Sequence, residues 1–399
     1  MGGAILWRYV KPAKNRFFTQ GMRAMASVMS RDFDEFADAL AGVDGRYLLL
    51  GSATRDWCLE VIALDGVTVM HGQDGAANLF QAACVSGVCS LFVPLDADCV
   101  TVNGTLLEQD HASWLATGSE FHIRARTAQR WVAVMIQLEA FDALHIDGDV
   151  VRACVERTRS GPVPAPTLAH LFALLQRARR ADREQAVSAA RLRDGIVRTC
   201  LCVLRSIDAA SARQLCTASN HARGRPPVPR QTIIRRALDV IQADSTRQVH
   251  MIDLCQATGV SARTLQSVFR ENFGMSPYRY IVVRRLHDVH AAIRTASPRE
   301  TVSEICARHG IGDFGRFARA YRRHLGLAPS RRLAVRAQRV ASHRVRRAGD
   351  PRDRRPRLWR ARKVGSRLWS RCRRAPSLRE GRPWPLFPPG WPLRRLRRR

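Results

Sequence analysis

The sequence predicts a multidomain α+β protein, with an N-terminal β sandwich or barrel, a helical connector and a C-terminal all-α domain. Three observations predict it: two turn dipeptides between short apolar runs, apolar residues at helical spacing between residues 168 and 207, and two helix-turn-helix patterns 51 residues apart. The chain has 399 residues and is 46% hydrophobic, which is enough for more than one buried core.

Composition and pattern divide the chain into six segments. The segments are an N-terminal extension (1–30), a β domain (31–150), a helical connector (151–219), a linker (220–229), a double helix-turn-helix domain (230–335) and a tail (336–399). The linker contains Pro226-Pro227-Val228-Pro229, a composition typical of chain between folded units.

The β domain is predicted from turns and alternation. Asp65-Gly66 and Asn103-Gly104 each lie between two short apolar runs, which is the pattern of a β-hairpin. Later strands show every second residue apolar, namely Phe121, Ile123 and Ala125, then Val132, Val134, Ile136 and Leu138. Many short strands with tight turns favour a sandwich or a small barrel.

Neither a metal site nor an enzyme is indicated. His71, His111 and His122 stand singly, whereas a metal site needs clustered ligands, so we expect surface or hydrogen-bonded core histidines. The sequence contains no phosphate-binding glycine loop, nucleophile elbow or His-Glu-x-x-His pattern. We therefore expect no catalytic residue, no metal ligand and no cofactor.

The connector carries an apolar stripe at helical spacing. Its members are Leu168, Leu171, Phe172 and Leu175, followed by Leu192, Ile196, Cys200, Val203 and Ile207. Two roles remain open for this stripe: the seam of a homodimer, or packing onto the β domain of the same chain.

The cysteines predict neither a disulfide framework nor a zinc finger. There are 11 of them, an odd number, and none forms a Cys-x-x-Cys pair. Cys255 and Cys306 hold equivalent places in the two helix-turn-helix copies and are expected to be small buried residues. Residues 1–30 lack a signal-peptide core, and no apolar run approaches 18 residues, so we expect a cytoplasmic protein without a membrane partner.

Each helix-turn-helix copy pairs an apolar residue with a glycine five positions later. These are Leu254 with Gly259, and Ile305 with Gly310. The spacing predicts a short helix, a left-handed turn at the glycine and a second helix packed across the first.

The second helix of copy one is predicted to have an apolar inner side and a polar, basic outer side. Ser261 is the expected N-cap, and Leu265, Val268 and Phe269 share the inner side. The outer side, which suits a helix that reads the major groove of DNA, carries Arg263, Thr264, Gln266, Ser267 and Arg270.

In copy two, Asp313 is the expected cap, and Phe317 with Tyr321 or Ala320 points inward. Gly312 and Gly315 would each lower helix propensity by about 1 kcal/mol inside the helix. The basic outer side of this copy carries Arg316, Arg319, Arg322 and Arg323.

One amphipathic helix is predicted to join the copies. Residues 277–296 carry Val282, Leu286, Val289 and Ile293 at spacings of 4, 3 and 4. Ser297-Pro298 would then end this helix, and a capping box of Thr301 with Glu304 would begin the next one. A stiff connector would place the two reading helices roughly 34 Å apart, one turn of B-DNA.

These residues resemble the AraC-type transcriptional regulators over about residues 230–333. The resemblance is carried by Gly259-Val260-Ser261, by Phe269 with Phe273-Gly274-Met275-Ser276-Pro277, by Gly310 with Gly315-Arg316-Phe317-Ala318-Arg319, and by Leu325-Gly326 with Pro329-Ser330. It implies that the base-facing positions are Arg263, Gln266 and Ser267 in copy one, and Phe314, Gly315, Arg316 and Arg319 in copy two.

The resemblance also implies the rest of the architecture and the partners. The N-terminal β domain is similar, in pattern and order, to the family's cupin-like sensor or dimerisation domain. Double-stranded DNA, RNA polymerase, a small-molecule effector and a second copy of the chain are the implied partners, and activation of transcription is the commoner role. An alternative hypothesis is that the β domain binds no ligand and serves only in protein interaction.

The net charge of +32 is unevenly distributed. Residues 331–399 contain 25 Lys and Arg against 3 Asp and Glu, a net +22, which leaves +10 for residues 1–330. We expect the tail to be disordered by itself, either as a nonspecific nucleic-acid arm or without a selected role. A nonspecific nucleic-acid-binding or architectural protein driven by this tail is the alternative to a sequence-specific regulator.

Overall fold

The computed structural model describes residues 24–30, 33–40, 45–180, 186–218, 228–243, 249–297 and 299–335. Contacts divide the chain into the units Met1–Pro329 and Ser330–Arg399, and the features below belong to the first. The predictions for the tail 336–399 and for most of the linker 220–229 fall outside the described residues. Among the described helices, none combines the length and the apolar character that a membrane span needs.

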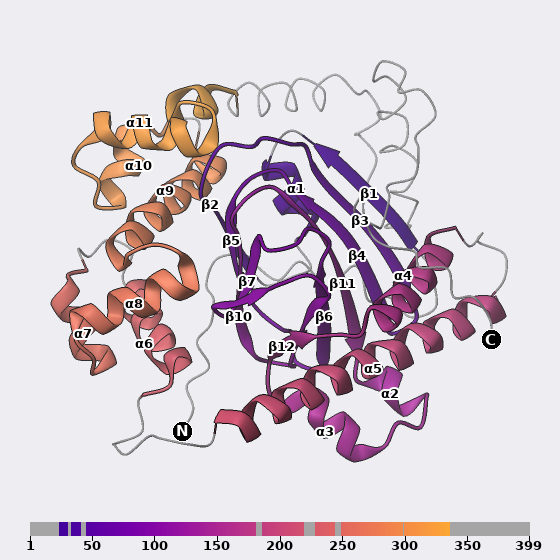
Figure 1. Ribbon diagram of the computed structural model, residues 1–399. Helices are drawn as coiled ribbons and strands as arrows, with labels where there is room; N and C mark the ends of the chain where they lie inside the picture. Colours follow the sequence, from indigo (N-terminus) through magenta and orange to yellow (C-terminus); the bar gives the residue numbers. More distant parts are fainter. Residues whose placement is uncertain are drawn as a thin grey trace, which may run out of the picture. The chain divides into compact units, whose positions relative to one another are not determined.

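Two antiparallel sheets form the N-terminal domain, as predicted (Figure 1). The first sheet has the order β1 (Ala24–Ser30), β3 (Trp57–Leu64), β4 (Val67–Asp74), β11 (Gln129–Gln137), β6 (Val88–Pro94), β9 (His111–Leu115) and β12 (Arg159–Pro162). The second sheet has the order β2 (Gly45–Leu49), β5 (Asn78–Ala83), β10 (Glu120–Ala125), β7 (Val100–Val102) and β8 (Thr105–Leu107).

Both predicted hairpins are present. Leu64 of β3 lies opposite Val67 of β4 across a turn in which Gly66 has a φ of 70°. In the β7–β8 turn, Asn103 and Gly104 have φ values of 50° and 84°. Positive φ at both central residues is the requirement of a type I′ turn, which explains why an Asn-Gly dipeptide occurs there.

The sheets extend beyond the predicted β segment. β1 lies within residues 1–30 and pairs with β3 from Ala24 opposite Ala63 to Ser30 opposite Trp57. β12 lies within the predicted helical connector and pairs with β9. Both are edge strands, each paired with one neighbour, and neither sequence shows the apolar alternation from which the other strands were predicted.

The helices of this domain are α1 (Phe33–Ala39), α2 (Glu139–Asp142), α3 (Gly148–Glu156), α4 (Ala165–Arg180) and α5 (Ala186–Ala218). α4 packs along α5, and α5 contacts β3, β9 and β12 (Figure 1). Every member of the apolar stripe is buried in the single chain. The stripe therefore packs within its own chain, which is the second of the two roles left open by the sequence.

The histidines correct an expectation from the sequence. His71 is 6% exposed, yet neither ring nitrogen has a hydrogen-bond partner among the described residues. Burial, with Arg179 nearby, lowers the pKa of His71 to about 4. His122 is also buried, its Nε2 is likewise unpaired in the described structure, and burial lowers its pKa to about 4. His71 and His122 are thus buried residues of the core, and His71 lacks the expected hydrogen bonds.

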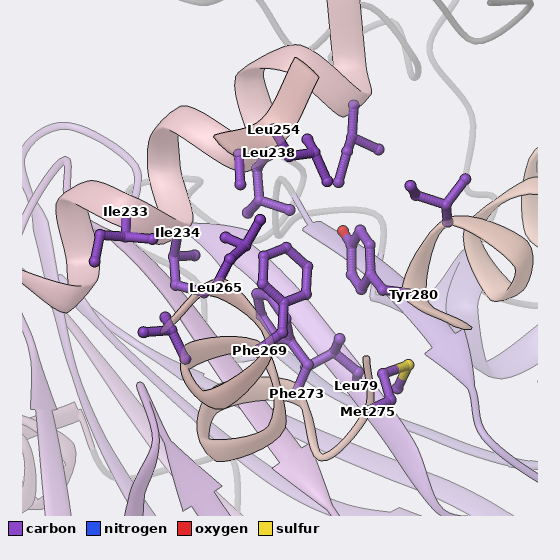
Figure 2. Close-up of a cluster of buried hydrophobic side chains, with 14 of the residues drawn as sticks. Leu79, Ile233, Ile234, Leu238, Leu254, Leu265, Phe269, Phe273, Met275 and Tyr280 are labelled. Atoms are coloured by element: carbon purple, nitrogen blue, oxygen red, sulfur yellow. The ribbon is translucent and has the colours of Figure 1, made fainter. Parts of the chain in front are cut away.

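The C-terminal helices are α6 (Arg230–Ala243), α7 (Met251–Thr258), α8 (Ala262–Phe273), α9 (Pro277–Thr295), α10 (Val302–Arg308) and α11 (Phe314–Leu325). Figure 2 shows the core of the first four, in which Phe269 and Phe273 point from α8 toward the ring of Tyr280. The rings of Phe273 and Tyr280 stack with centroids 5.0 Å apart. The same cluster includes Leu48 and Leu79 from the second sheet.

α9 matches the predicted joining helix except at one position. Leu286, Val289 and Ile293 are buried, but Val282 is 37% exposed, whereas its neighbour Val283 is 2% exposed. The expected inward position of Val282 is wrong because α9 is packed on more than one side, so its buried residues do not follow a single stripe.

Candidate nucleic-acid interface

The first helix-turn-helix unit consists of α7, a turn at Gly259 and α8. Gly259 has a φ of 71°, the left-handed conformation that favours glycine, and closes α7 by donating its N–H to the Cys255 carbonyl. Ser261 then caps α8, since its hydroxyl accepts the N–H of Thr264 at 3.2 Å. The turn and the cap are therefore where the sequence predicts them. Cys255 is half-buried rather than fully buried.

α8 separates its side chains as expected for a reading helix. Leu265, Val268 and Phe269 are at most 3% exposed and anchor the helix on α6, α7 and α9. Arg263, Thr264, Ser267 and Arg270 are exposed and Gln266 is half-buried. A guanidinium can bond a guanine edge with two hydrogens, and a glutamine amide can do the same with adenine, so this surface carries suitable donors and acceptors.

Glu271 on α8 and Arg230 at the start of α6 were not predicted from the sequence as partners of this surface. Ser267 donates its hydroxyl to Glu271 Oε1 at 3.0 Å, one helical turn later. Glu271 Oε2 in turn forms an ion pair of 2.6 Å with Arg230 at the start of α6. The i, i+4 spacing of Ser267 and Glu271 was the available signal. Ser267 is thus oriented by a carboxylate on the reading helix itself.

The second unit consists of α10, a turn at Gly310 and α11. Thr301 and Glu304 form the predicted capping box at the start of α10, with bonds of 2.8 and 3.2 Å to each other's backbone N–H. Gly310 has a φ of 67°. Asp313 caps α11 as predicted, accepting the Arg316 N–H at 2.8 Å.

α11 also presents an apolar inner side and a basic outer side. Phe317 and Tyr321 are buried, so Tyr321 rather than Ala320 takes the second inner position. Gly312 precedes the N-cap and Gly315 lies in the first turn, where a glycine costs less than in the helix interior. The predicted contact residues are all exposed, namely Phe314, Gly315, Arg316, Arg319, Arg322 and Arg323.

α9 carries both units. It has 19 residues, hence a length of about 28 Å, and α8, α10 and α11 all contact it. The buried Tyr321 of α11 bonds His290 Nδ1 on α9 through its hydroxyl at 2.7 Å. The other ring nitrogen of His290 lies 2.7 Å from a carboxylate oxygen of Asp34 on α1. α11 is therefore fixed both to α9 and, through one histidine, to the β domain.

The second sheet contacts the first helix-turn-helix unit and α9. Arg46 of β2 forms an ion pair of 2.9 Å with Asp288 of α9. His122 of β10 packs against Phe273, with ring centroids 5.0 Å apart. Gly274, which follows α8, approaches Arg124 so closely that a Cβ there would overlap its guanidinium. The β domain thus touches the C-terminal end of a reading helix and leaves its outer side exposed.

Comparisons with known proteins match this same region. A family model described as a helix-turn-helix domain matches residues 254–334. The chain is 32% identical over 102 residues to the probable thc operon regulatory protein of Rhodococcus erythropolis, a match that covers 25% of this chain and 31% of that protein. It is 28% identical over 101 residues to XylDLEGF operon transcriptional activator 2 of Pseudomonas putida, covering 25% of this chain and 64% of that protein.

Among solved structures, the chain is similar to a probable AraC family transcriptional regulator from Rhodopseudomonas palustris CGA009. The two are 28% identical, the match covers 26% of this chain and 96% of the regulator, and the TM-score is 0.25. The chain spans less than two thirds of the length of the curated relatives named above. What they share with it is the double helix-turn-helix region, and over that region the chain is similar to AraC-type transcriptional regulators.

Proposed function

We propose that the protein is a sequence-specific transcription regulator that reads two adjacent major-groove segments with α8 and α11. The observation that carries the proposal is the pair of capped helices whose predicted contact residues all lie on their outer sides, exposed or half-buried, while their inner sides are anchored on one helix. A shared stiff support gives the two helices a constant separation, which two blocks of sequence on one face of DNA require.

The test is selection of bound sequences from a random duplex pool by the full chain at near-physiological salt. The proposal predicts a motif of two conserved blocks about one helical turn apart, bound roughly a thousandfold or more tightly than random duplex. Recovery of no motif from folded protein would contradict it. Transcription in vitro with purified RNA polymerase, from a promoter that has the selected site upstream, then tests the direction of control. Activation predicts more transcript when the protein is added, whereas repression predicts less.

Control by a small molecule is the second part of the proposal, and the two faces of the second sheet support it. Side chains along β2, β5 and β10 alternate between the two faces of this sheet. One face carries Arg46, Leu48, Leu79, Gln81, His122 and Arg124, and the other carries Tyr47, Asn78, Phe80, Phe121 and Ile123. Members of the first set contact the DNA-binding region, whereas the second set lines a cavity between the two sheets. A ligand that moves these strands would move the surface on which α8 and α9 rest.

The basic tail favours a second candidate, nonspecific nucleic-acid binding, because residues 331–399 carry +22 of the net charge. Deletion of residues 336–399 separates the two. For a specific regulator, the deletion lowers the slope of log affinity against log salt and keeps the preference for the selected site. If the deletion removes the preference for the selected site and also lowers the slope of log affinity against log salt, the tail is the main binding element.

A further inference from the structure

The cavity between the two sheets is apolar over most of its wall and leaves about 70 Å³ for water-sized atoms. Its lining comes from strands of both sheets and includes Met70, Phe80, Phe92, Phe121 and Met135. Space of this size holds several waters or one small molecule, and an apolar wall favours the molecule.

The lining carries no cationic side chain. No Lys, Arg or His occurs among the described residues that line the cavity. Cys84 lines it as a neutral thiol, since burial raises its pKa to about 12. An anionic ligand would therefore lose its hydration and gain no opposite charge, which is costly in an apolar site.

The one carboxyl group in the lining is already fully bonded. Asp74 Oδ2 accepts Asn78 Nδ2 at 3.0 Å and Gln129 Nε2 at 2.9 Å. Asp74 Oδ1 accepts Trp131 Nε1 at 3.0 Å and the Tyr47 hydroxyl at 3.5 Å. Burial raises the pKa of Asp74, which also disfavours its charged form. A cationic ligand would have to break this network, so Asp74 does not offer a free ion-pair partner.

Two polar groups in the lining remain for a ligand, Ser90 Oγ and the buried Gln129 Oε1, which has no hydrogen-bond partner among the described residues. Ser90 is 7% exposed and lies on β6 between Val88 and Phe92, and all three residues line the cavity while Cys89 and Leu91 face away. The hydroxyl has no hydrogen bond to any residue that the structure describes. A buried polar atom without a partner costs free energy, and a ligand hydroxyl, which can donate and accept, can bond Ser90 Oγ or donate to Gln129 Oε1.

We propose that this cavity binds a small, neutral, mainly apolar molecule carrying one hydroxyl group, which hydrogen-bonds Ser90 Oγ. The inference rests on the proposed effector control, because it names the ligand class of the same domain. Carboxylates of the same size are disfavoured because the lining has no cationic side chain, and ammonium ions because the Asp74 carboxyl group is already hydrogen-bonded.

The experiment titrates the full chain, labelled at its methionine methyl groups, with 1-butanol, butyrate and butylammonium at pH 7. Met70 and Met135 line the cavity, whereas Met29 is 62% exposed and reports nonspecific effects. We expect 1-butanol to shift the Met70 and Met135 signals saturably and to leave Met29 unchanged. Butyrate and butylammonium should shift none of them at equal concentration.

Two variants and a control sharpen the result. Ser90→Ala should weaken 1-butanol binding about five- to tenfold, as expected for one neutral hydrogen bond. Ala133→Leu, which fills the cavity from β11, should abolish it. Ser113→Ala on β9 removes a buried hydroxyl that does not line the cavity and bonds Ser160, so 1-butanol binding should be unchanged.

Binding of butyrate or butylammonium as tight as that of 1-butanol would overturn the proposed class. An unchanged affinity in Ser90→Ala would overturn the role of the hydroxyl, and no shift with any ligand would overturn the site. Affinity for the selected DNA, measured in the same samples, keeps the proposals apart. Lost ligand binding with intact DNA recognition refutes only this inference, whereas ligand binding that leaves DNA affinity unchanged refutes effector control and not the ligand class.

Discussion

The hydroxyl of Tyr280, at the start of the helix that joins the two reading units, donates a hydrogen bond of 2.7 Å to the amide oxygen of Gln81 on β5. Both side chains are buried, 1% and 4% exposed. The bond joins residues 199 positions apart in the chain, and it connects the sheet that lines the cavity directly to the core of the first helix-turn-helix unit. It is therefore a contact through which the β domain can hold the DNA-binding region in place.

The first prediction concerns this bond. Tyr280→Phe and Gln81→Leu should each destabilise the protein, and the double variant should be less destabilised than the sum, with a coupling free energy of about 0.5–1.5 kcal/mol. Urea unfolding of the full chain measures it. Tyr278→Phe, which removes a hydroxyl from a 67% exposed residue on the same helix, is the matched control and should show no coupling to Gln81→Leu. Additive effects of Tyr280→Phe and Gln81→Leu would contradict the contact.

The second prediction concerns base readout by α8. Arg263→Ala and Gln266→Ala should relax the preference at defined bases and cost about 1–3 kcal/mol on the preferred site, with little change on random duplex. Arg236→Ala, on the exposed side of α6, removes the same charge without touching a reading helix and should leave the preference intact. Equal losses on the preferred and random duplexes would assign Arg263 and Gln266 to phosphate contacts instead.

The third prediction concerns the core under α8. Leu265 is fully buried, so Leu265→Ala should lower the free energy of unfolding by about 2–5 kcal/mol. Ile252 lies on the neighbouring α7 and is 64% exposed, so Ile252→Ala should change it by no more than about 0.5 kcal/mol. Chemical denaturation of the two variants gives both values, and similar values would contradict the inward orientation of Leu265.

The fourth prediction is a pH dependence at the contact between the domains. The backbone N–H of Leu49 donates to His287 Nε2 at 2.8 Å, so this nitrogen must be unprotonated. Burial, with further contributions from His290, Arg46 and His324, lowers the pKa of His287 from 6.5 to about 3. The unfolded chain therefore binds the proton more readily. The stability that His287 contributes is complete above about pH 6.5 and is lost as the pH falls toward 3, by up to about 1.4 kcal/mol per pH unit.

Thermal or urea unfolding at several pH values between 6.5 and 5 tests this. His287→Gln keeps an acceptor for Leu49 but does not titrate. The slope of the free energy of unfolding against pH should therefore be smaller than in the native chain, by up to about 1.4 kcal/mol per pH unit, the contribution of one proton. His170→Gln changes an exposed histidine on α4 and should leave the slope as it is. A His287→Gln slope equal to the native one would show that His287 does not carry the dependence.

Local signals predicted α8 and α11 well. Gly259, Ser261 and Asp313 each determine a turn or a cap by their own backbone or side-chain chemistry, so a few neighbouring residues are sufficient evidence. The positive φ of Gly259 and the two cap bonds are found at the predicted residues. Exposure of the outer side then follows from the 3.6-residue period, which places the arginines of α11 opposite Phe317 and Tyr321.

Contacts between distant residues were beyond such signals. The bond between Tyr280 and Gln81 and the approach of Arg124 to Gly274 depend on how the second sheet docks on the helices, which no spacing along the chain encodes. For the same reason His71 was misjudged, because its burial comes from the arrangement of separate segments rather than from its own strand. The cavity and Ser90 were likewise not predicted, since both sheets together create them.

The central claim is that α8 and α11, held on one connecting helix, read two DNA blocks one helical turn apart. The most direct test measures affinity for the selected site after insertion of five base pairs between its two blocks, which turns one block to the opposite face of the duplex. The account predicts that affinity falls to that of a site with one intact block, and that insertion within flanking sequence has no effect. Unchanged affinity after the insertion would contradict the claim, because the two helices would then not be reading DNA as a rigid pair.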